Sequence, residues 1–531
     1  MALTIRRATA GDAAEWIRLL TEALGTDYVA PEVYDPHWVA GQLGNTGGEE
    51  TWVADLDGRL LGSVSILASS MPSHNPVANL GRYLAAPGPE SDGAIDTFLR
   101  EITGRCVQRH QMAVVRVSAS DLATQSRLEN LGYVCVGFQP SKHLWRVRHG
   151  ILFYICTGPP DTVERLPLSQ SLPQIVELAT AVLRNLRLPN PDIVRDGLTG
   201  YPLQTELKIA DAARDAYENW KVEAMSSDPP VEISNQFSRG LGLFRIPADA
   251  PLRALLALRD GNLVAGLSYY FDDHDKCLRI VDAAAMDDLS LGAVLLHAVH
   301  FGQEKLGAVY VEVDFLIDGP RALKSAEQIG FVPVAYLPGF YDHKGFYVDL
   351  VKMVKLNAAY TLDHTSFTTH ARQIVDIIDR NFQDQKVGVA VISLLRKLPI
   401  FDGLGDGELG KMARLFTQKL YRAGERVFAK GESSNEAYIV VRGQVDIFLD
   451  GNARPVASVA SGQIIGEQAF LDGAPRTALG VASQPTILLV IQRPTFNILV
   501  QREPHLGMVV MRNIAREVSQ KLRTTSAALT K

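Results

Sequence analysis

The sequence predicts an α/β protein of several domains, in which two similar mixed-sheet units precede a C-terminal β-rich domain. The length, 531 residues, suits three or four domains of ordinary size. One order of predicted strands and helices occurs twice, at about 1–157 and at about 230–357. From about residue 390 the pattern changes to short alternating runs separated by glycines, which is typical of an antiparallel roll or barrel.

Composition excludes several classes of protein. Hydrophobic residues make up 47% and charged residues 21% of the chain, which argues against extensive disorder. The four cysteines form no C-x-x-C pair, so neither a disulfide framework nor a metal site is expected. No apolar run reaches membrane-spanning length, and the arginines near the N-terminus precede no apolar signal core. We therefore expect a cytoplasmic protein with no membrane partner.

The first unit begins with a strand and an amphipathic helix in 3–24, with Thr9 or Asp12 as the helix cap. Two β-rich runs in 51–67 flank Asp57-Gly58, a dipeptide typical of tight hairpins because both positions favour positive φ. A buried strand (113–119), a helix (120–132) and a final hairpin complete the unit.

The second unit repeats this order. Residues 252–271 again form two β-rich runs, now around Asp260-Gly261. A buried strand (307–315) and a helix ending at a glycine (320–336, with its following strand) come next. The matching order indicates duplication of one α/β unit, the alternative being two unrelated units with ordinary turns.

Two connectors complete the N-terminal part. Residues 158–229 are expected to be mostly helical, with helices over 171–187 and 205–225. The linker 358–389 includes a helix over 370–382 that carries an apolar stripe formed by Ile374, Ile378 and Phe382.

The C-terminal domain, 390–531, contains the segment with the clearest chemistry, GEQAFLDGAPRTA (466–478). A fixed arginine, Arg476, suits a phosphate because its fork gives charge-assisted hydrogen bonds. A carboxylate, Glu467, can accept a hydrogen bond from a sugar hydroxyl. The alternative is an unrelated glutamate and arginine in a surface loop.

This segment resembles the phosphate-binding cassette of the cyclic nucleotide-binding domain family, and glycines at 424, 431, 443 and 462 also match. The resemblance covers 390–531 and implies a β-roll with flanking helices. It implies that Arg476 binds the cyclic phosphate and Glu467 the ribose 2′-hydroxyl. The other site residues that it implies are Gly466, which lets the backbone approach, Gln468 and Ala469, whose N–H groups face the phosphate, and Thr477, a hydroxyl donor.

The same resemblance suggests cAMP as the ligand, with cGMP as the alternative. The long C-terminal helix (504–523) would cover the base, through Met508, Met511 or Arg512. It also suggests a homodimer formed through that helix. Nothing after residue 523 resembles a helix-turn-helix, so no nucleic-acid partner is expected. Residues 391–531 carry 18 basic and 12 acidic residues, which suits an anion site but also fits chance variation between domains.

The two N-terminal units resemble the GNAT acetyltransferase fold, through the opening strand and helix, the Asp-Gly hairpin and the LGY/IGF turns. This implies an acyl-CoA such as acetyl-CoA, with its pyrophosphate on a glycine-rich turn at a helix N-terminus. Only Gly93-Ala94 matches this turn in the first unit, which is expected to be degenerate. In the second unit, Leu291, Gly292 and Ala293 match. The preceding Asp287 and Asp288 would oppose a pyrophosphate unless basic side chains or a metal offset them.

The family's acidic tyrosine corresponds to Leu128 and Ala326, which cannot donate a proton. The candidate catalytic groups of the second unit are Glu312 and Asp314 as bases and Tyr341 as an acid. The alternatives are a solvated strand end and a tyrosine that only packs.

Together these features predict a cAMP-sensing protein in which ligand binding regulates a GNAT-like N-acyltransferase acting on an amine, such as a protein lysine or a small amine. The alternative is a non-catalytic sensor or scaffold whose GNAT-like units have lost their activity.

Overall fold

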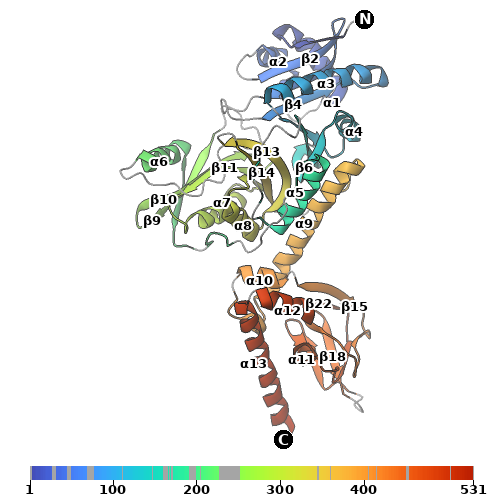
Figure 1. The fold of residues 1–531 in the computed structure, drawn as a ribbon, viewed down its shortest axis with the longest axis vertical. Helices are drawn as coiled ribbons and strands as arrows, with labels where there is room; N and C mark the ends of the chain where they lie inside the picture. Colours follow the sequence, from blue (N-terminus) through green and yellow to red (C-terminus); the bar gives the residue numbers. More distant parts are fainter. Residues whose placement is uncertain are drawn as a thin grey trace. The chain divides into compact units, whose positions relative to one another are not determined.

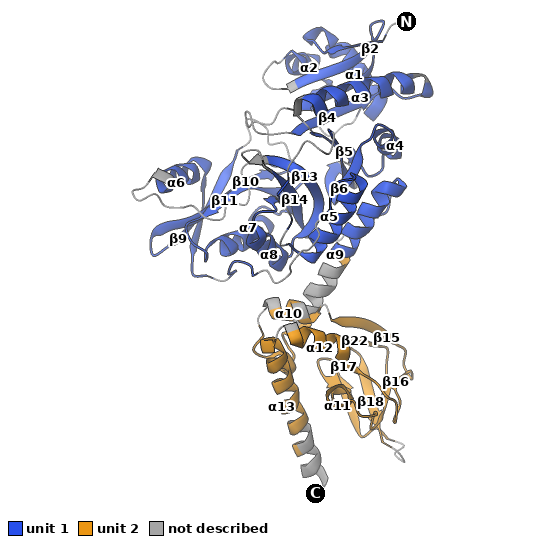
Figure 2. Cartoon of the chain, in the orientation of Figure 1, with its two compact units in different colours: residues 1–382 blue, residues 383–531 orange. Residues whose placement is uncertain are grey.

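The computed structural model describes residues 3–26, 31–44, 49–67, 77–110, 112–145, 147–158, 165–166, 168, 171–190, 199–203, 205–226, 251–343, 346–358, 360, 362–404, 406–413, 415–449, 454–502 and 504–529. The chain divides into two compact units, 1–382 and 383–531 (Figure 2). None of the helices in these described ranges is long and apolar enough to cross a membrane.

Unit 1 is built on a fourteen-stranded sheet (Figure 1). Its strands are β1 (Leu3–Arg7), β2 (Glu49–Leu56), β3 (Arg59–Leu67), β4 (Val77–Ala85), β5 (Met112–Ser118), β6 (Val134–Trp145), β7 (Val147–Thr157), β8 (Lys208–Ala213), β9 (Arg253–Arg259), β10 (Asn262–Asp272), β11 (Cys277–Ala285), β12 (Tyr310–Leu316), β13 (Val332–His343) and β14 (Phe346–Leu356). The helical elements are η1 (Ala10–Asp12), α1 (Ala13–Leu24), η2 (Pro31–Tyr34), α2 (Pro36–Leu43), α3 (Pro89–His110), α4 (Leu122–Asn130), α5 (Pro173–Asn185), α6 (Arg214–Ser226), α7 (Leu291–Lys305), α8 (Pro320–Ile329) and α9 (Thr369–Leu395).

The strand order of this sheet is one pattern used twice. From one edge it reads β1-β2-β3-β4-β5-β7-β6, and from the other edge β8-β9-β10-β11-β12-β14-β13. The two halves join where β6 and β13 run antiparallel, with Gly137 opposite Ala335. The repeated topology agrees with the predicted duplication, and we call the two halves the first and the second repeat.

Both predicted hairpin turns are confirmed. Asp57 and Gly58 have φ of 53° and 89°, and Asp260 and Gly261 have φ of 52° and 84°. Two successive positive φ values give the turn whose twist matches that of the flanking strands, which explains why Asp-Gly occurs in both repeats.

One predicted helix is partly wrong. The helix expected over 205–225 begins only at Arg214, because Lys208–Ala213 forms β8, the edge strand that pairs with β9. The two partly buried residues of this strand, Ile209 and Ala212, are three positions apart, which is also compatible with helical spacing. The sheet of the second repeat therefore includes a strand from the predicted connector.

The helix predicted over 370–382 is confirmed as the first part of α9. Its stripe of Ile374, Ile378 and Phe382 is buried in the main core of unit 1. That core is continuous through both repeats, because residues of β5, β7 and α5 share it with residues of β11, β12 and α7.

Unit 2 contains two four-stranded antiparallel sheets, ordered β15-β22-β17-β20 and β16-β21-β18-β19. The strands are β15 (Phe416–Tyr421), β16 (Arg426–Phe428), β17 (Glu436–Arg442), β18 (Gln444–Phe448), β19 (Ala457–Ala460), β20 (Ile464–Ile465), β21 (Leu479–Ala482) and β22 (Thr486–Gln492). The helical elements are η4 (Pro399–Phe401), α10 (Asp406–Ala413), α11 (Glu467–Asp472), α12 (Arg493–Arg502) and α13 (Pro504–Leu529). The predicted β-roll with flanking helices is therefore present (Figure 1).

Candidate functional site

The predicted cassette lies between β20 and β21, around the single short helix α11. Gly466 precedes this helix and Gly473 ends it, and both have a φ of 76°. A side chain on Gly466 would also collide with Arg476, since a Cβ there would lie 2.3 Å from Nη1 of that arginine. The glycine is therefore required by both its backbone conformation and the arginine beside it.

Arg476 is the centre of this arrangement, and its side chain is only 4% exposed. Its Nη1 donates to the carbonyl of Gly466 at 2.9 Å. Its Nη2 donates to Ser434 Oγ at 2.8 Å and to the Glu436 carbonyl at 2.5 Å. The guanidinium also lies over two aromatic rings, 4.8 Å from the ring centre of Phe428 and 5.4 Å from that of Tyr438.

These contacts leave the charge of Arg476 without an anion. Within the described residues, no carboxylate forms an ion pair with it, and its buried Nε has no hydrogen-bond acceptor. A buried cation without a counterion is costly, and a bound phosphate would supply both the charge and the acceptor. The residues present therefore fit an anionic ligand at Arg476.

The other predicted cassette residues lie on the same short segment. Glu467, the first residue of α11, is 7% exposed, and Ala469 is 4% exposed. Gln468 and Thr477 are exposed. The segment thus buries the carboxylate of Glu467 and the guanidinium of Arg476, while the amide of Gln468 and the hydroxyl of Thr477 remain open to solvent.

Sequence reasoning missed the residues that hold Arg476 from the other side. Ser434 and Glu436 are about 40 positions earlier and reach the site because β17 lies beside α11 and β20. Burial alone would raise the pKa of Glu436, but hydrogen bonds from Tyr438 and Lys419 lower it. No local sequence signal marks such partners, since only strand pairing brings them together.

Helix α13 packs into the helical core of unit 2 through Leu506, Val510 and Ile514. Asn513 fixes it further by donating to the carbonyls of Ile400 and Asp402. Of the residues considered for the base, Met508 is 60% and Met511 40% exposed, and Arg512 is also exposed.

The predicted acyl-CoA residues of the second repeat lie at the start of α7. All three are buried, and a Cβ on Gly292 would lie 2.5 Å from the carbonyl oxygen of Pro202. The glycine thus permits close approach of the chain's own backbone. The other two matching residues, Leu291 and Ala293, flank it.

The two aspartates that precede this turn each have a basic partner. Asp287 pairs with Arg259 at 2.6 Å, and Asp288 pairs with Arg321 at 2.8 Å. The basic side chains that could offset these carboxylates are therefore present.

Glu312 lies on β12 and is 1% exposed. Gln139 and Lys142 of the first repeat donate to it at 2.8 and 3.1 Å, and Arg279 donates at 2.9 Å. Burial alone would raise the pKa of Glu312, but the neighbouring cations hold it well below its usual range. This carboxylate therefore joins the two repeats through buried ion pairs.

The other two candidate catalytic residues lie on β12 and β13 of the same repeat, two strands that β14 separates in the sheet. Asp314 is 3% exposed and pairs with Lys352 at 2.7 Å. Tyr341 lies on β13 opposite Val348, directly after an irregularity in the strand pairing. Glu312 and Asp314 meet at Lys352, which is also 3.8 Å from Glu312.

In each repeat, two neighbouring strands run parallel and pair over only four residues. Beyond these four residues the two strands are no longer paired. β4 and β5 pair from Val77–Met112 to Leu80–Val115, and β11 and β12 pair from Cys277–Tyr310 to Ile280–Val313. The helices α3 and α7 follow β4 and β11 directly. Both repeats thus have the same short parallel contact followed by a helix.

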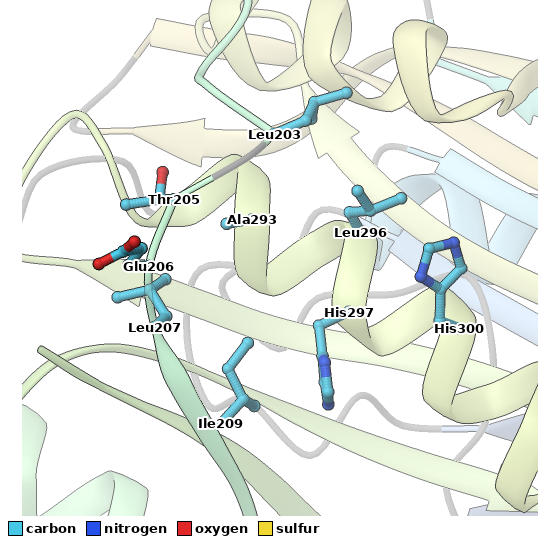
Figure 3. Close-up of a pocket in the computed structure, with 9 residues that line it drawn as sticks. All are labelled: Leu203, Thr205, Glu206, Leu207, Ile209, Ala293, Leu296, His297 and His300. Atoms are coloured by element: carbon cyan, nitrogen blue, oxygen red, sulfur yellow. The ribbon is translucent and has the colours of Figure 1, made fainter.

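An open groove of about 520 Å³ lies along α7 (Figure 3). Ala293, Leu296, His297 and His300 line it from the helix, and residues of the segment that leads into β8 line it from the other side. Desolvation lowers the pKa of His297, and the nearby His300 lowers it further.

Comparison with known proteins concerns unit 2. Residues 418–503 match the model of the family described as "Cyclic nucleotide-binding domain". The chain is 31% identical to the cyclic AMP receptor protein of Thermus thermophilus over 134 residues, which is 25% of this chain and 60% of that protein. It is 28% identical to the cAMP-dependent protein kinase regulatory subunit of Schizosaccharomyces pombe over 144 residues, 27% of this chain and 32% of that one.

Among solved structures, the chain is similar to the catabolite activator protein of Thermus thermophilus, with 30% identity and a TM-score of 0.23. That match covers 25% of this chain and 62% of the other. The chain thus spans less than two thirds of these relatives, and the matched segment includes the cassette around Arg476. Residues 418–503 form a cyclic nucleotide-binding domain.

Proposed function

We propose that this protein senses a cyclic nucleotide, cAMP in the first place, through the cassette of unit 2. The observation that carries the proposal is Arg476, a buried guanidinium with no anionic partner among the described residues. Glu467, nine residues earlier and also buried, is suited to accept a hydrogen bond from the ribose hydroxyl. The relatives named for cAMP support this ligand, and a similar cGMP-dependent protein kinase of Caenorhabditis elegans keeps cGMP as the alternative.

Titration calorimetry of the full chain with cAMP and cGMP tests the proposal. We expect Arg476→Ala to weaken cAMP binding by about a hundredfold, since a charge-assisted bidentate contact is lost. Arg476→Lys keeps the positive charge but lacks the guanidinium fork. Its affinity for cAMP should lie between that of the unmutated chain and that of Arg476→Ala. Arg442→Ala removes an exposed arginine of β17 and should leave binding unchanged. Equal cAMP affinity in all four proteins would refute the assignment.

A second proposal concerns the two repeats, which would form GNAT-like units, the second with acyl-CoA-dependent N-acyltransferase activity under control of the cyclic nucleotide. The short parallel contact followed by a helix in both repeats supports it, as do the arginine partners of Asp287 and Asp288. Leu291, Gly292 and Ala293 would then lie beside the acyl-CoA. The amine acceptor, a protein lysine or a small amine, would react near Asp314 and Tyr341.

The alternative is a sensor whose repeats are a non-catalytic scaffold, and the surroundings of Glu312 favour it. A carboxylate held far below its usual pKa is a poor general base at neutral pH. Thermal shift separates the two, because a ligand stabilises the native state by mass action. A shift with cAMP alone supports the scaffold. A shift with acetyl-CoA as well supports the enzyme.

A further inference from the structure

The first repeat contains a cavity of about 500 Å³ that the proposed function does not use. Its floor is one face of the sheet, where Arg7 lies opposite Trp52 and Ile66 lies opposite Glu50. Residues opposite each other on neighbouring strands project to the same side. The last turns of α3 close the cavity with Arg105 and other residues.

Trp52 is the central side chain of this cavity. Arg105 lies over its ring with Cζ 4.5 Å from the ring centre, and the Cζ of Arg7 lies at 5.7 Å. Its indole Nε1 is buried and has no hydrogen-bond acceptor within the described residues. An unsatisfied buried donor is costly, so this N–H indicates a site for an acceptor.

The other walls define what kind of molecule the cavity suits. Ile66 and Cys106 are 8% and 1% exposed and give apolar surface beside the indole ring. Arg105 pairs with Glu101 on its own helix, at 2.5 Å, and Arg7 pairs with Glu50. Because these pairs are at least partly solvent-exposed, they are weak and leave both guanidinium groups able to attract a further anion.

We propose that this cavity binds a small carboxylate with a compact apolar body. One carboxylate oxygen accepts from the indole N–H of Trp52, and the charge is stabilised by Arg105. The apolar body packs against Ile66 and Cys106. The groove along α7 of the second repeat is lined by histidines and Glu206 with no arginine among its described lining residues, so it is not expected to bind the same ligand (Figure 3).

Calorimetry of the full chain with benzoate and hexanoate tests this proposal, with benzamide and 1-hexanol as neutral analogues. We expect both carboxylates to bind saturably and the neutral analogues to bind at least about tenfold more weakly. Trp52→Phe keeps an aromatic ring but removes the N–H, and Arg105→Gln removes the charge. Each should weaken benzoate binding about five- to tenfold, whereas Arg100→Gln, on an exposed arginine of the same helix, should not.

Alkylation of the unmutated chain gives an independent measure of location. Cys106 lines the cavity and Cys156 does not line it, so benzoate should slow the reaction of Cys106 with N-ethylmaleimide relative to that of Cys156. The proposal is overturned if neither carboxylate binds, if both variants bind benzoate like the parent, or if Cys106 gains no protection. Loss of cAMP binding in the Arg476 variants would not affect any of these results.

Discussion

The two repeats of unit 1 share a strand order and a hairpin turn, but they differ in charge at matching positions. The third residue of β5 is Val114, and the third residue of β12 is Glu312. The residue that follows the last parallel pair is Arg116 in the first repeat and Asp314 in the second. Sheet pairing depends on backbone hydrogen bonds and on small turns, so one topology accommodates an apolar or a charged interior. In the second repeat, the charged Glu312 forms a buried ion pair with Lys142 of the first repeat.

The variant with the largest expected effect on stability removes the carboxylate of Glu312, which residues of both repeats contact. Glu312→Ala leaves the buried Lys142 without its carboxylate partner and Arg279 with Asp272 alone, and we expect the free energy of unfolding to fall by about 3–5 kcal/mol. Val114→Ala, at the matching position, should cost about 2 kcal/mol through lost burial and a cavity. All five tryptophans precede residue 383, so tryptophan fluorescence during urea unfolding follows unit 1. Equal losses in the two variants would show that the buried ion pairs do not join the repeats.

The strand contact between the repeats gives the next effect. A Cβ on Gly137 would lie 2.3 Å from the Cβ of Ala335, so Gly137→Ala should destabilise unit 1 by about 2 kcal/mol. Gly104→Ala, in α3 with no atom close to its Cβ, should instead stabilise the unit by about 0.5–1 kcal/mol. Fluorescence-detected unfolding measures both. A tolerated alanine at residue 137 would mean that β6 and β13 are further apart than described.

A pH-dependent contact also joins the repeats. Burial alone would raise the pKa of Asp275, but hydrogen bonds from His143 and the Leu144 N–H, together with Lys142, lower it to about 2. Because this folded-state pKa lies below the unfolded value, the carboxylate stabilises the protein above about pH 4 and loses that effect as the pH falls towards 2.

We therefore expect Asp275→Asn to cost about 1.5 kcal/mol at pH 7 and progressively less below pH 4. Urea unfolding at several pH values checks this. A cost that stays constant between pH 7 and pH 3 would mean that the ionised carboxylate does not hold the junction.

The smallest effect tests what the repeats share. Gly58 and Gly261 have nearly equal positive φ and open space where a Cβ would lie. Gly58→Ala and Gly261→Ala should each cost about 1 kcal/mol, from backbone strain alone. Thermal unfolding followed by fluorescence measures both. Clearly unequal costs would show that the hairpins differ in more than sequence.

Prediction from sequence worked best where neighbours in the chain decide the structure. The Asp-Gly turns and the helix of Ile374, Ile378 and Phe382 each depend on a few adjacent residues, and both predictions are confirmed. The cassette was found for the same reason, since Gly466 to Thr477 form one continuous segment. The strand at Lys208–Ala213 was missed because its structure depends on pairing with β9, which lies about 45 residues later.

The amino-acid sequence alone determined that the chain has two similar α/β repeats and a C-terminal cyclic nucleotide-binding domain, because turns, apolar periodicity and the cassette are local patterns. Only the tertiary structure decided how these patterns are used. It joined the repeats through β6 and β13 and buried Glu312 beneath cations from both. It also brought Ser434 to Arg476. These contacts link residues about 30 to 200 positions apart, and their energy comes from burial and charge pairing in the packed interior, which no local pattern contains.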